Sequence, residues 1–230
     1  LLKVDIPYDI RSFDMEEFYS IGVDPGFSGG FAIIHQKNDG SLDVSVHAAP
    51  IIKTKAKGKA KAKNEYDVAA IAKILRPLEN RTVYAYLERV SAMPGNGAVS
   101  MFHFGEGFGV WKGILGTLGF KLELVSPVTW KSEWVDKLIK KLEKPEILKL
   151  KQGDVNRLSA ADRKKHKEAQ KQHKQDNEQA KKLAKDNARE LATTLYPTLE
   201  DEFKLKKDDG KAEALLIAEY LRRQINAPKQ

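Results

Sequence analysis

The sequence contains no cysteine. Disulfides and thiolate metal sites are therefore excluded, so a bound metal must be held by carboxylate or imidazole groups, which favour hard cations such as magnesium or manganese. No apolar run is long enough to cross a bilayer, and the N-terminal segment "LLKVDIPYDIRSF" lacks the residue order of a signal peptide. We expect a soluble, cytoplasmic protein, or an organellar one if the N-terminus is trimmed.

Acidic residues are fewer than basic ones. The chain has 32 Asp and Glu residues against 40 Lys and Arg residues, which gives a net charge of +8. This balance suits a polyanionic partner such as nucleic acid, although many ordinary proteins are as basic. The length of 230 residues and the apolar fraction of 41% allow a sizeable core. We expect one domain over residues 1–230 that carries an insertion.

The order of predicted elements is three strands, a helix, a strand, a helix, a strand and then closing helices. The first three strands form an antiparallel meander with a hairpin turn at Asp39 and Gly40. The first helix stops at Pro77, and the second is rich in glycine. The predicted strands are residues 18–25, 29–36, 42–49, 82–90 and 120–127, and the predicted helices are residues 65–78, 99–119, 128–142 and 206–223.

Two stretches can bury almost nothing. Residues 53–63 alternate lysine with small residues and are predicted to form a loop, which is either solvated or reaches for phosphates through Lys55, Lys57 and Lys59. The stretch from about residue 144 to residue 185 is dominated by Lys, Gln, Asp, Glu and Ala and cannot form a core of its own. We interpret it as an insertion that is partly one long solvated helix.

This order of elements is typical of the ribonuclease H-like fold, an α/β fold whose mixed five-stranded sheet is flanked by helices and whose first and fourth strands are parallel neighbours. Asp24 ends the first strand and Glu88 ends the fourth, so both carboxylates are predicted at one edge of the sheet. Asp209 and Glu213 share one face of the final helix, which can cross that edge. Two divalent ions about 4 Å apart would neutralise these four acids and form a phosphoryl-transfer centre.

Each acid also has an ordinary structural role open to it. Asp24 can belong to an Asp-Pro-Gly turn, and Glu88 can pair with a nearby arginine. Asp209 can cap its helix, and Glu213 can be a first-turn acid that suits the helix dipole. The occurrence of all four in the chain order that one fold requires favours a shared site.

Four segments resemble the RuvC superfamily of Holliday-junction resolvases, and they look most similar to the chloroplast resolvase branch with its phage and bacterial relatives. In bacterial RuvC enzymes an acid or histidine stands three residues before the last acid, whereas this sequence has Gly210 there. The spacing of Asp209 and Glu213 resembles the chloroplast branch instead, and either Asp208 or Asp209 is the ligand. The four segments are "IGVDPGFSGGFAII", "YLERVSAMPGNG", "FGEGFGVWKGILGTLGFKLELVSPVTWK" and "KKDDGKAEALLIAEYL".

The resemblance implies a homodimer in which each subunit cuts one of two opposed strands of a four-way DNA junction. Asp24 would bridge two magnesium ions, for which manganese would substitute, while Glu88, Asp209 and Glu213 would complete their shells. The products would carry 5′-phosphate and 3′-hydroxyl ends. Lys131 would hold a phosphate near the site.

Two further regions are assigned roles by the resemblance or by their composition. Met93 and Asn96 lie in the loop after the fourth strand, where relatives insert residues at the junction centre and an apolar wedge unstacks bases at least cost. Glycines in the second predicted helix permit close packing, so we expect the dimer to form through residues 104–115. Its aromatic residues, expected in the core or the dimer interface, are Phe102, Phe104, Phe108 and Trp111.

Two other functions fit the same residues. A different ribonuclease H-like nuclease would act on flaps or RNA–DNA hybrids rather than junctions. A non-catalytic nucleic-acid binder would use the acids as caps and turn residues and bind through its basic arms. Cleavage assays on branched and hybrid substrates, with and without magnesium, distinguish the three.

Overall fold

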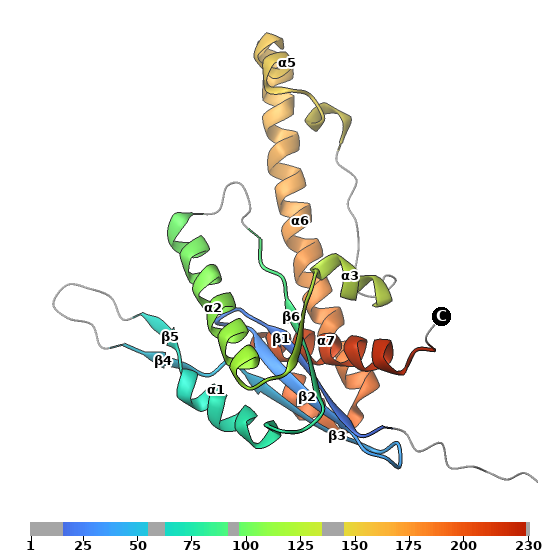
Figure 1. Ribbon diagram of the computed structural model, residues 1–230. Helices are drawn as coiled ribbons and strands as arrows, with labels where there is room; N and C mark the ends of the chain where they lie inside the picture. Colours follow the sequence, from blue (N-terminus) through green and yellow to red (C-terminus); the bar gives the residue numbers. More distant parts are fainter. Residues whose placement is uncertain (1–15, 55–62, 92–96, 135–144, 229–230) are drawn as a thin grey trace, which may run out of the picture.

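A mixed five-stranded sheet forms the centre of the protein (Figure 1). The computed structural model describes residues 16–54, 63–91, 97–134 and 145–228. The strands are β1 (Phe18–Asp24), β2 (Gly30–Gln36), β3 (Leu42–Ala48), β6 (Val83–Glu88) and β7 (Lys121–Val125), in the order β3-β2-β1-β6-β7. The meander β1-β2-β3 is antiparallel, whereas β1, β6 and β7 are parallel. The predicted parallel pairing of the first strand with the strand that ends in Glu88 is confirmed.

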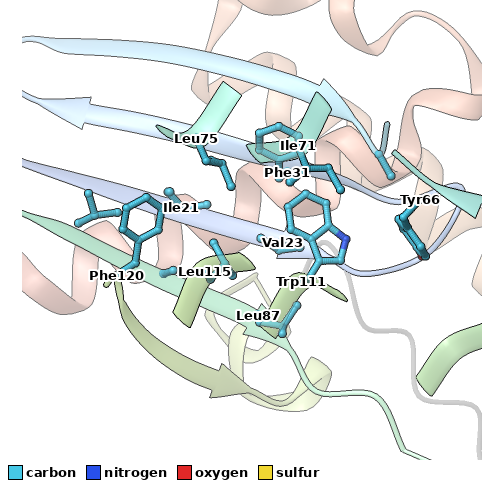
Figure 2. Packing of buried hydrophobic residues seen from close by; sticks show 13 residues of the cluster. Ile21, Val23, Phe31, Tyr66, Ile71, Leu75, Leu87, Trp111, Leu115 and Phe120 are labelled. Carbon is cyan, nitrogen blue, oxygen red and sulfur yellow. The ribbon is translucent and has the colours of Figure 1, made fainter. Parts of the chain in front are cut away.

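One face of the sheet is covered by α1 (Val68–Leu75) and α2 (Ala98–Thr117). Alternation along β1 directs Ile21 and Val23 to this face, where they pack with Phe31 of β2 (Figure 2). Trp111 of α2 is fully buried among them, as expected for a core aromatic. Phe102 and Phe104 remain exposed, in the first two turns of the same helix.

The opposite face is covered by α7 (Asp209–Asn226) and by the C-terminal part of α6 (Ala160–Leu195). The helix α7 lies unusually close to the central strand, because a Cβ atom at Gly22 would lie 2.9 Å from Cα of Ala218. Only glycine at this position of β1 allows that approach. The close packing fixes α7 against the strand that carries Asp24.

The first predicted helix is shorter than expected. Residues 65–78 were predicted to be helical, but β5 (Asn64–Tyr66) pairs with β4 (Ile51–Lys53) in a small second sheet. The helix α1 begins only after Asp67, whose side chain accepts a hydrogen bond from the backbone N–H of Ala70 at 2.9 Å. At its other end, Pro77 lies in the short 3₁₀ segment η1 (Arg76–Leu78), in accord with the predicted stop.

The polar insertion contains the long helix that its composition predicts. The helix α6 continues without interruption past residue 185 to Leu195, so the polar stretch and the following amphipathic stretch form one element. It projects far beyond the sheet in Figure 1. Leu148 and His166 are nevertheless buried, so the insertion has a small packed contact of its own. Its other elements are η3 (Glu146–Leu148) and α5 (Gln152–Arg157).

Short elements connect the larger ones. A five-residue helix, α3 (Pro127–Lys131), and the 3₁₀ segment η2 (Ser132–Trp134) follow β7. Two further 3₁₀ segments, η4 (Pro197–Phe203) and η5 (Lys206–Asp208), join α6 to α7. Within the four described ranges, no helix is both long and apolar enough to span a membrane.

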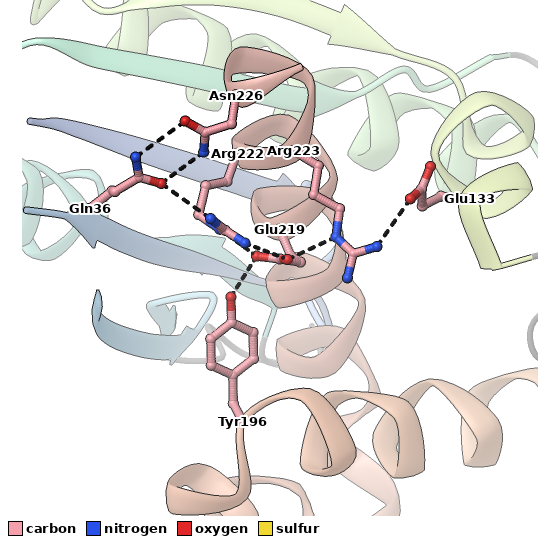
Figure 3. A network of polar contacts seen from close by, with 7 residues as sticks. All are labelled: Gln36, Glu133, Tyr196, Glu219, Arg222, Arg223 and Asn226. Atoms are coloured by element: carbon pink, nitrogen blue, oxygen red, sulfur yellow. Dashed lines mark hydrogen bonds and ion pairs between the residues drawn. The ribbon is translucent and has the colours of Figure 1, made fainter. Parts of the chain in front are cut away.

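A buried polar network ties α7 to its surroundings (Figure 3). Glu219 of α7 accepts hydrogen bonds from Tyr196 at 2.6 Å, from Arg222 at 2.8 and 2.9 Å, and from Arg223 at 2.9 Å. Arg222 also donates to Gln36 of β2 at 3.1 Å. Burial alone would raise the pKa of Glu219, but these donors outweigh it and hold the pKa below its ordinary value.

Glu219→Gln should destabilise the protein by about 3 kcal/mol, because it leaves two arginines beside a neutral group in a buried position. A carboxylate with a lowered pKa stabilises the fold above its ordinary pKa and loses that contribution as pH falls through the folded value. The difference between variant and wild type should therefore be full at pH 7 and shrink below about pH 4. Urea unfolding at several pH values measures it, and a pH-independent difference would contradict the assignment.

Candidate active site

Asp24 is the last residue of β1 and precedes a tight turn. A Cβ atom at Gly29 would lie 2.9 Å from Cγ of Asp24, so glycine is required there to keep the chain clear of this carboxylate. Burial, together with the negative charges of Glu213 and Glu88, raises the pKa of Asp24 to about 7. Two carboxylates from two other elements are therefore close enough for their charges to disfavour ionisation of Asp24.

Glu88 ends β6, the strand beside β1. Its Oε2 atom accepts a hydrogen bond from the indole Nε1 of Trp130 at 2.7 Å, so an indole rather than an arginine is its partner among the described residues. Burial raises the pKa of Glu88, and the Trp130 hydrogen bond and the charge of Lys131 offset only part of that effect. The indole N–H fixes the orientation of a carboxylate that carries no full counter-charge.

The two adjacent aspartates at the start of α7 have different surroundings. Asp208 accepts a hydrogen bond from the backbone N–H of Leu205 at 2.9 Å and lies 3.3 Å from the ammonium of Lys211. This is a structural role at the helix start. Asp209 is buried and accepts a hydrogen bond from the ammonium of Lys185, which also lies close enough to Asp24 and Glu213 to respond to their charges. Asp209 is thus the one that faces the other acids.

Glycine at position 210 allows α7 to reach the turn after β1. A Cβ atom on Gly210 would lie 2.6 Å from Cα of Gly29 and closer still to the carbonyl oxygen of Ser28. Both neighbours are backbone atoms and cannot rotate away. The residue that departs from the bacterial RuvC pattern is therefore the residue that lets the start of α7 contact the turn beside Asp24.

Two lysines provide the positive charge at this edge of the sheet. Lys131 of α3 donates to Oε1 of Glu213 at 2.7 Å, and Lys185 of α6 donates to Asp209. Within the part of the chain that the structure describes, no three acidic or histidine side chains form a ready-made metal site. Two of the four acids are paired with these ammonium groups instead, which leaves two carboxylates without a full counter-charge.

The donor set fits a hard divalent cation. All four candidate ligands are carboxylates, and oxygen ligands are those that magnesium and manganese prefer. If all four are ionised, the two lysines leave a net charge of −2, which one divalent ion would neutralise. Asp24, Glu88 and Glu213 would hold such an ion, because their mutual repulsion is what its charge would relieve.

Comparisons with known proteins add no assignment. Neither a protein-family model nor a curated protein matches this chain. The chemistry of the site is therefore inferred from its own residues.

Of the residues predicted to bind DNA, Lys131 lies in the site and pairs with Glu213. Its ammonium also lies 4.8 Å from the centroid of the Trp130 ring, a cation–π contact. The remaining five lie outside the described residues, so their predicted roles stay predictions. They are Lys55, Lys57, Lys59, Met93 and Asn96.

The sequence did not indicate two residues of the site. Lys185 was one of many lysines in a polar block, and only the course of α6 across the sheet edge singles it out. Trp130 lies in a segment that resembles the RuvC family, but nothing in the sequence assigns it a role, which comes from the contact of its indole with Glu88. Neither contact follows from local spacing, because each joins residues more than 20 positions apart.

Asp24→Asn should stabilise the metal-free protein. An acid with a raised pKa stabilises the fold below its ordinary pKa and loses that contribution as pH rises through the folded value, here about 7. In EDTA the advantage of the variant should grow from about pH 4 and level off above pH 7, reaching at most about 4 kcal/mol. Thermal unfolding across this range measures it. Excess magnesium should shrink the difference, and equal melting temperatures at pH 8 in EDTA would refute it.

Proposed function

We propose that this protein is a metal-dependent endonuclease with a ribonuclease H-like fold, of the RuvC type that resolves four-way DNA junctions by paired, symmetrical nicks. One observation carries the proposal. Asp24, Glu88 and Glu213 come from β1, β6 and α7, and they are close enough that the charges of Glu213 and Glu88 add to burial in raising the pKa of Asp24. Converging acids of this kind are typical of sites that bind cations and phosphates.

The arrangement of elements supports this reading. The sheet order places β1 and β6 side by side and parallel, and α7 crosses β1 near the end where Asp24 lies. These are the relations that a ribonuclease H-like site requires. The segments that resemble the RuvC family overlap β1, β6, α3 and α7, which carry Asp24, Glu88, Lys131 and Glu213.

Each side chain then has a defined task. Asp24, Glu88 and Glu213, with Asp209 beside them, would hold magnesium, which supplies charge that activates water and stabilises the leaving oxygen in phosphodiester hydrolysis. Trp130 holds Glu88 in place through its indole N–H. Lys131 and Lys185 neutralise Glu213 and Asp209 and offer ammonium groups to incoming phosphates.

The proposal is tested by incubating the protein with a synthetic four-way junction in magnesium and in EDTA. Paired nicks at symmetrical positions, seen only with magnesium, are the expected result. A flap and an RNA–DNA hybrid of the same sequence serve as controls. Preferential cleavage of either control would assign a different nuclease activity, and binding without cleavage of any substrate in magnesium would indicate a non-catalytic binder.

Resolution by paired nicks requires two active sites, and α2 offers a surface for a second copy. Gly105, Gly109 and Gly113 are spaced four residues apart, and a Cβ atom at each would meet no other atom within 4 Å. This open strip is where another helix could approach closely. Beside it, Val110 and Ile114 line a groove between α1 and α2.

Gly109→Leu should therefore convert a dimer to a monomer without unfolding the protomer, because a Cβ atom at this position meets no other atom of the protomer within 4 Å. Sedimentation velocity at micromolar concentration measures the change. The control is Gly116→Ala, which is equally open but lies outside residues 104–115. A wild-type protein that sediments as a monomer and still makes paired nicks would show that no dimer is needed.

A further inference from the structure

Seven lysines follow one side of α6. Most are three, four or seven residues from the next, spacings that bring residues of a helix to the same side, and Lys181 and Lys182 are adjacent. All seven are exposed. Glu178 occupies the gap between Lys174 and Lys181, and Glu168 lies four residues after Lys164. The lysine row comprises Lys164, Lys167, Lys171, Lys174, Lys181, Lys182 and Lys185.

The direction of the lysine row is fixed at its C-terminal end. Lys185 donates a hydrogen bond to Asp209, so the row begins at the candidate active site. From there it runs along the part of α6 that projects beyond the sheet (Figure 1). Lys164 lies 21 residues before Lys185, which corresponds to about 30 Å at about 1.5 Å per residue. That length matches about nine base pairs of a DNA duplex.

Most of the row forms no ion pair with the part of the chain that the structure describes. Among the described residues, Lys164, Lys167 and Lys171 form no ion pair. Within the described ranges, Lys185 at the site is the one member of the row that forms an ion pair. A series of exposed, unpaired ammonium groups along one side of a helix suits a repeating array of negative charges.

The composition of the helix favours nucleic acid over other polyanionic partners. From residue 160 to residue 182, α6 contains no apolar side chain larger than alanine. Protein interfaces have an apolar centre, and helices that lie on membranes have an apolar face. This segment has neither. Phosphate contacts alone need only well-placed cations.

We propose that the lysine row binds the phosphate backbone of a duplex DNA arm that extends from the nicked site. The proposal rests on the proposed function, because it takes the carboxylates around Asp24 as the point where the DNA strand is cut. In this proposal, α6 contacts one arm of the branched substrate along its length and so sets the direction of that arm. The contact is independent of sequence, since ammonium groups reach phosphates rather than base edges.

The test compares two double variants that carry the same change of charge. Lys167→Gln with Lys171→Gln removes two members of the row, and Lys73→Gln with Lys165→Gln removes two exposed lysines outside it. Glutamine and lysine have similar helix propensities, so both variants should keep the melting temperature of the wild type. Fluorescence anisotropy in EDTA, from about 50 to about 200 mM salt, measures binding to a four-way junction.

The row variant should bind a junction with arms of about 20 base pairs on the order of tenfold more weakly at about 100 mM salt, and its log–log salt slope should fall by about two. The control variant should match the wild type. With arms cut to about five base pairs and closed by hairpins, all three proteins should bind alike, because a short arm cannot reach the far end of the row. Row and control variants with equal affinities for the long-arm junction would overturn the proposal.

Binding and cleavage are scored separately, so failure of either proposal can be recognised. If the wild type never cuts in magnesium but the row variant still loses arm-dependent binding, the lysine row binds DNA and the nuclease assignment fails. If junctions are cut in magnesium but the row variant binds and cuts like the control, the nuclease assignment stands and α6 is not a DNA guide. A loss of binding to duplex RNA alone, with DNA unaffected, would also overturn the proposal.

Discussion

Asp24→Asn should abolish cleavage of a four-way junction in magnesium. The amide keeps the shape of the side chain but loses the charge that would hold a cation. Asp24 is also the acid whose pKa is raised by burial and by the charges of Glu213 and Glu88, so it lies where their negative charges meet. A loss of at least a thousandfold, down to the background of the assay, is expected. The nicking rate on a labelled junction measures it. The same variant should be more stable than the wild type in EDTA, so the loss cannot be attributed to unfolding.

Glu213→Gln and Asp209→Asn should behave in the same way if both are ligands. Junction binding in calcium or EDTA should survive in all three variants and can tighten, because removing a negative charge reduces repulsion of the phosphates. Asp208→Asn is the matched control, since the Asp208 side chain caps the start of the helix and pairs with Lys211. It should cost about 1 kcal/mol of stability and leave the nicking rate nearly unchanged. A Glu213→Gln protein that nicks at the wild-type rate would remove Glu213 from the site.

Gly210→Ala should reduce cleavage by about a hundredfold or more without touching any ligand. The new methyl group would lie 2.6 Å from Cα of Gly29, and the backbone there cannot yield as a side chain would. The first turn of α7 must therefore shift away from the turn that follows Asp24, and Asp209 and Glu213 shift with it. Displacements of about 1 Å are enough to cost that much in rate.

The control for this substitution is Gly116→Ala, where a methyl group meets nothing within 4 Å. On an exposed helical position the change should stabilise α2 by roughly 0.5–1 kcal/mol. Gly210→Ala should instead destabilise the protein by about 1–3 kcal/mol through overpacking. Nicking rates and urea unfolding of both variants test the pair. Unchanged nicking by Gly210→Ala would show that α7 is free to move without loss of the site.

The strands and their pairing could be predicted because their signals are local. Short apolar stretches separated by turn residues such as Asp39 and Gly40 marked β1, β2 and β3, and the chain order of the elements placed Asp24 beside the strand that ends in Glu88. The four-residue spacing of Asp209 and Glu213 put them on one face of α7, and the structure directs both toward lysines of the site.

The contacts that complete the site could not be predicted in this way. Trp130 meets Glu88, and Lys185 meets Asp209, only because α3 and α6 lie across the sheet edge. Long-range packing also decides the β4–β5 pairing, which took Tyr66 out of the predicted helix. Its hydroxyl donates to the carbonyl oxygen of Pro25 at 2.8 Å, so the small hairpin supports the turn beside Asp24.

The helix α6 is continuous, and only its C-terminal part packs against the sheet and α7. Its 36 residues span about 54 Å, and the end near Tyr196 is clamped by the bond to Glu219 and by packing on α7. When a helix that is held at one end bends, the displacement is largest at its other end. Lys185 lies close to the packed end, where Asp209 accepts its hydrogen bond, and should move little, whereas Lys164 lies near the other end and should be displaced more when the helix bends. One helix therefore holds Lys185 in a fixed position beside the carboxylates and should let the lysines some 30 Å away adjust to the position of a bound DNA arm.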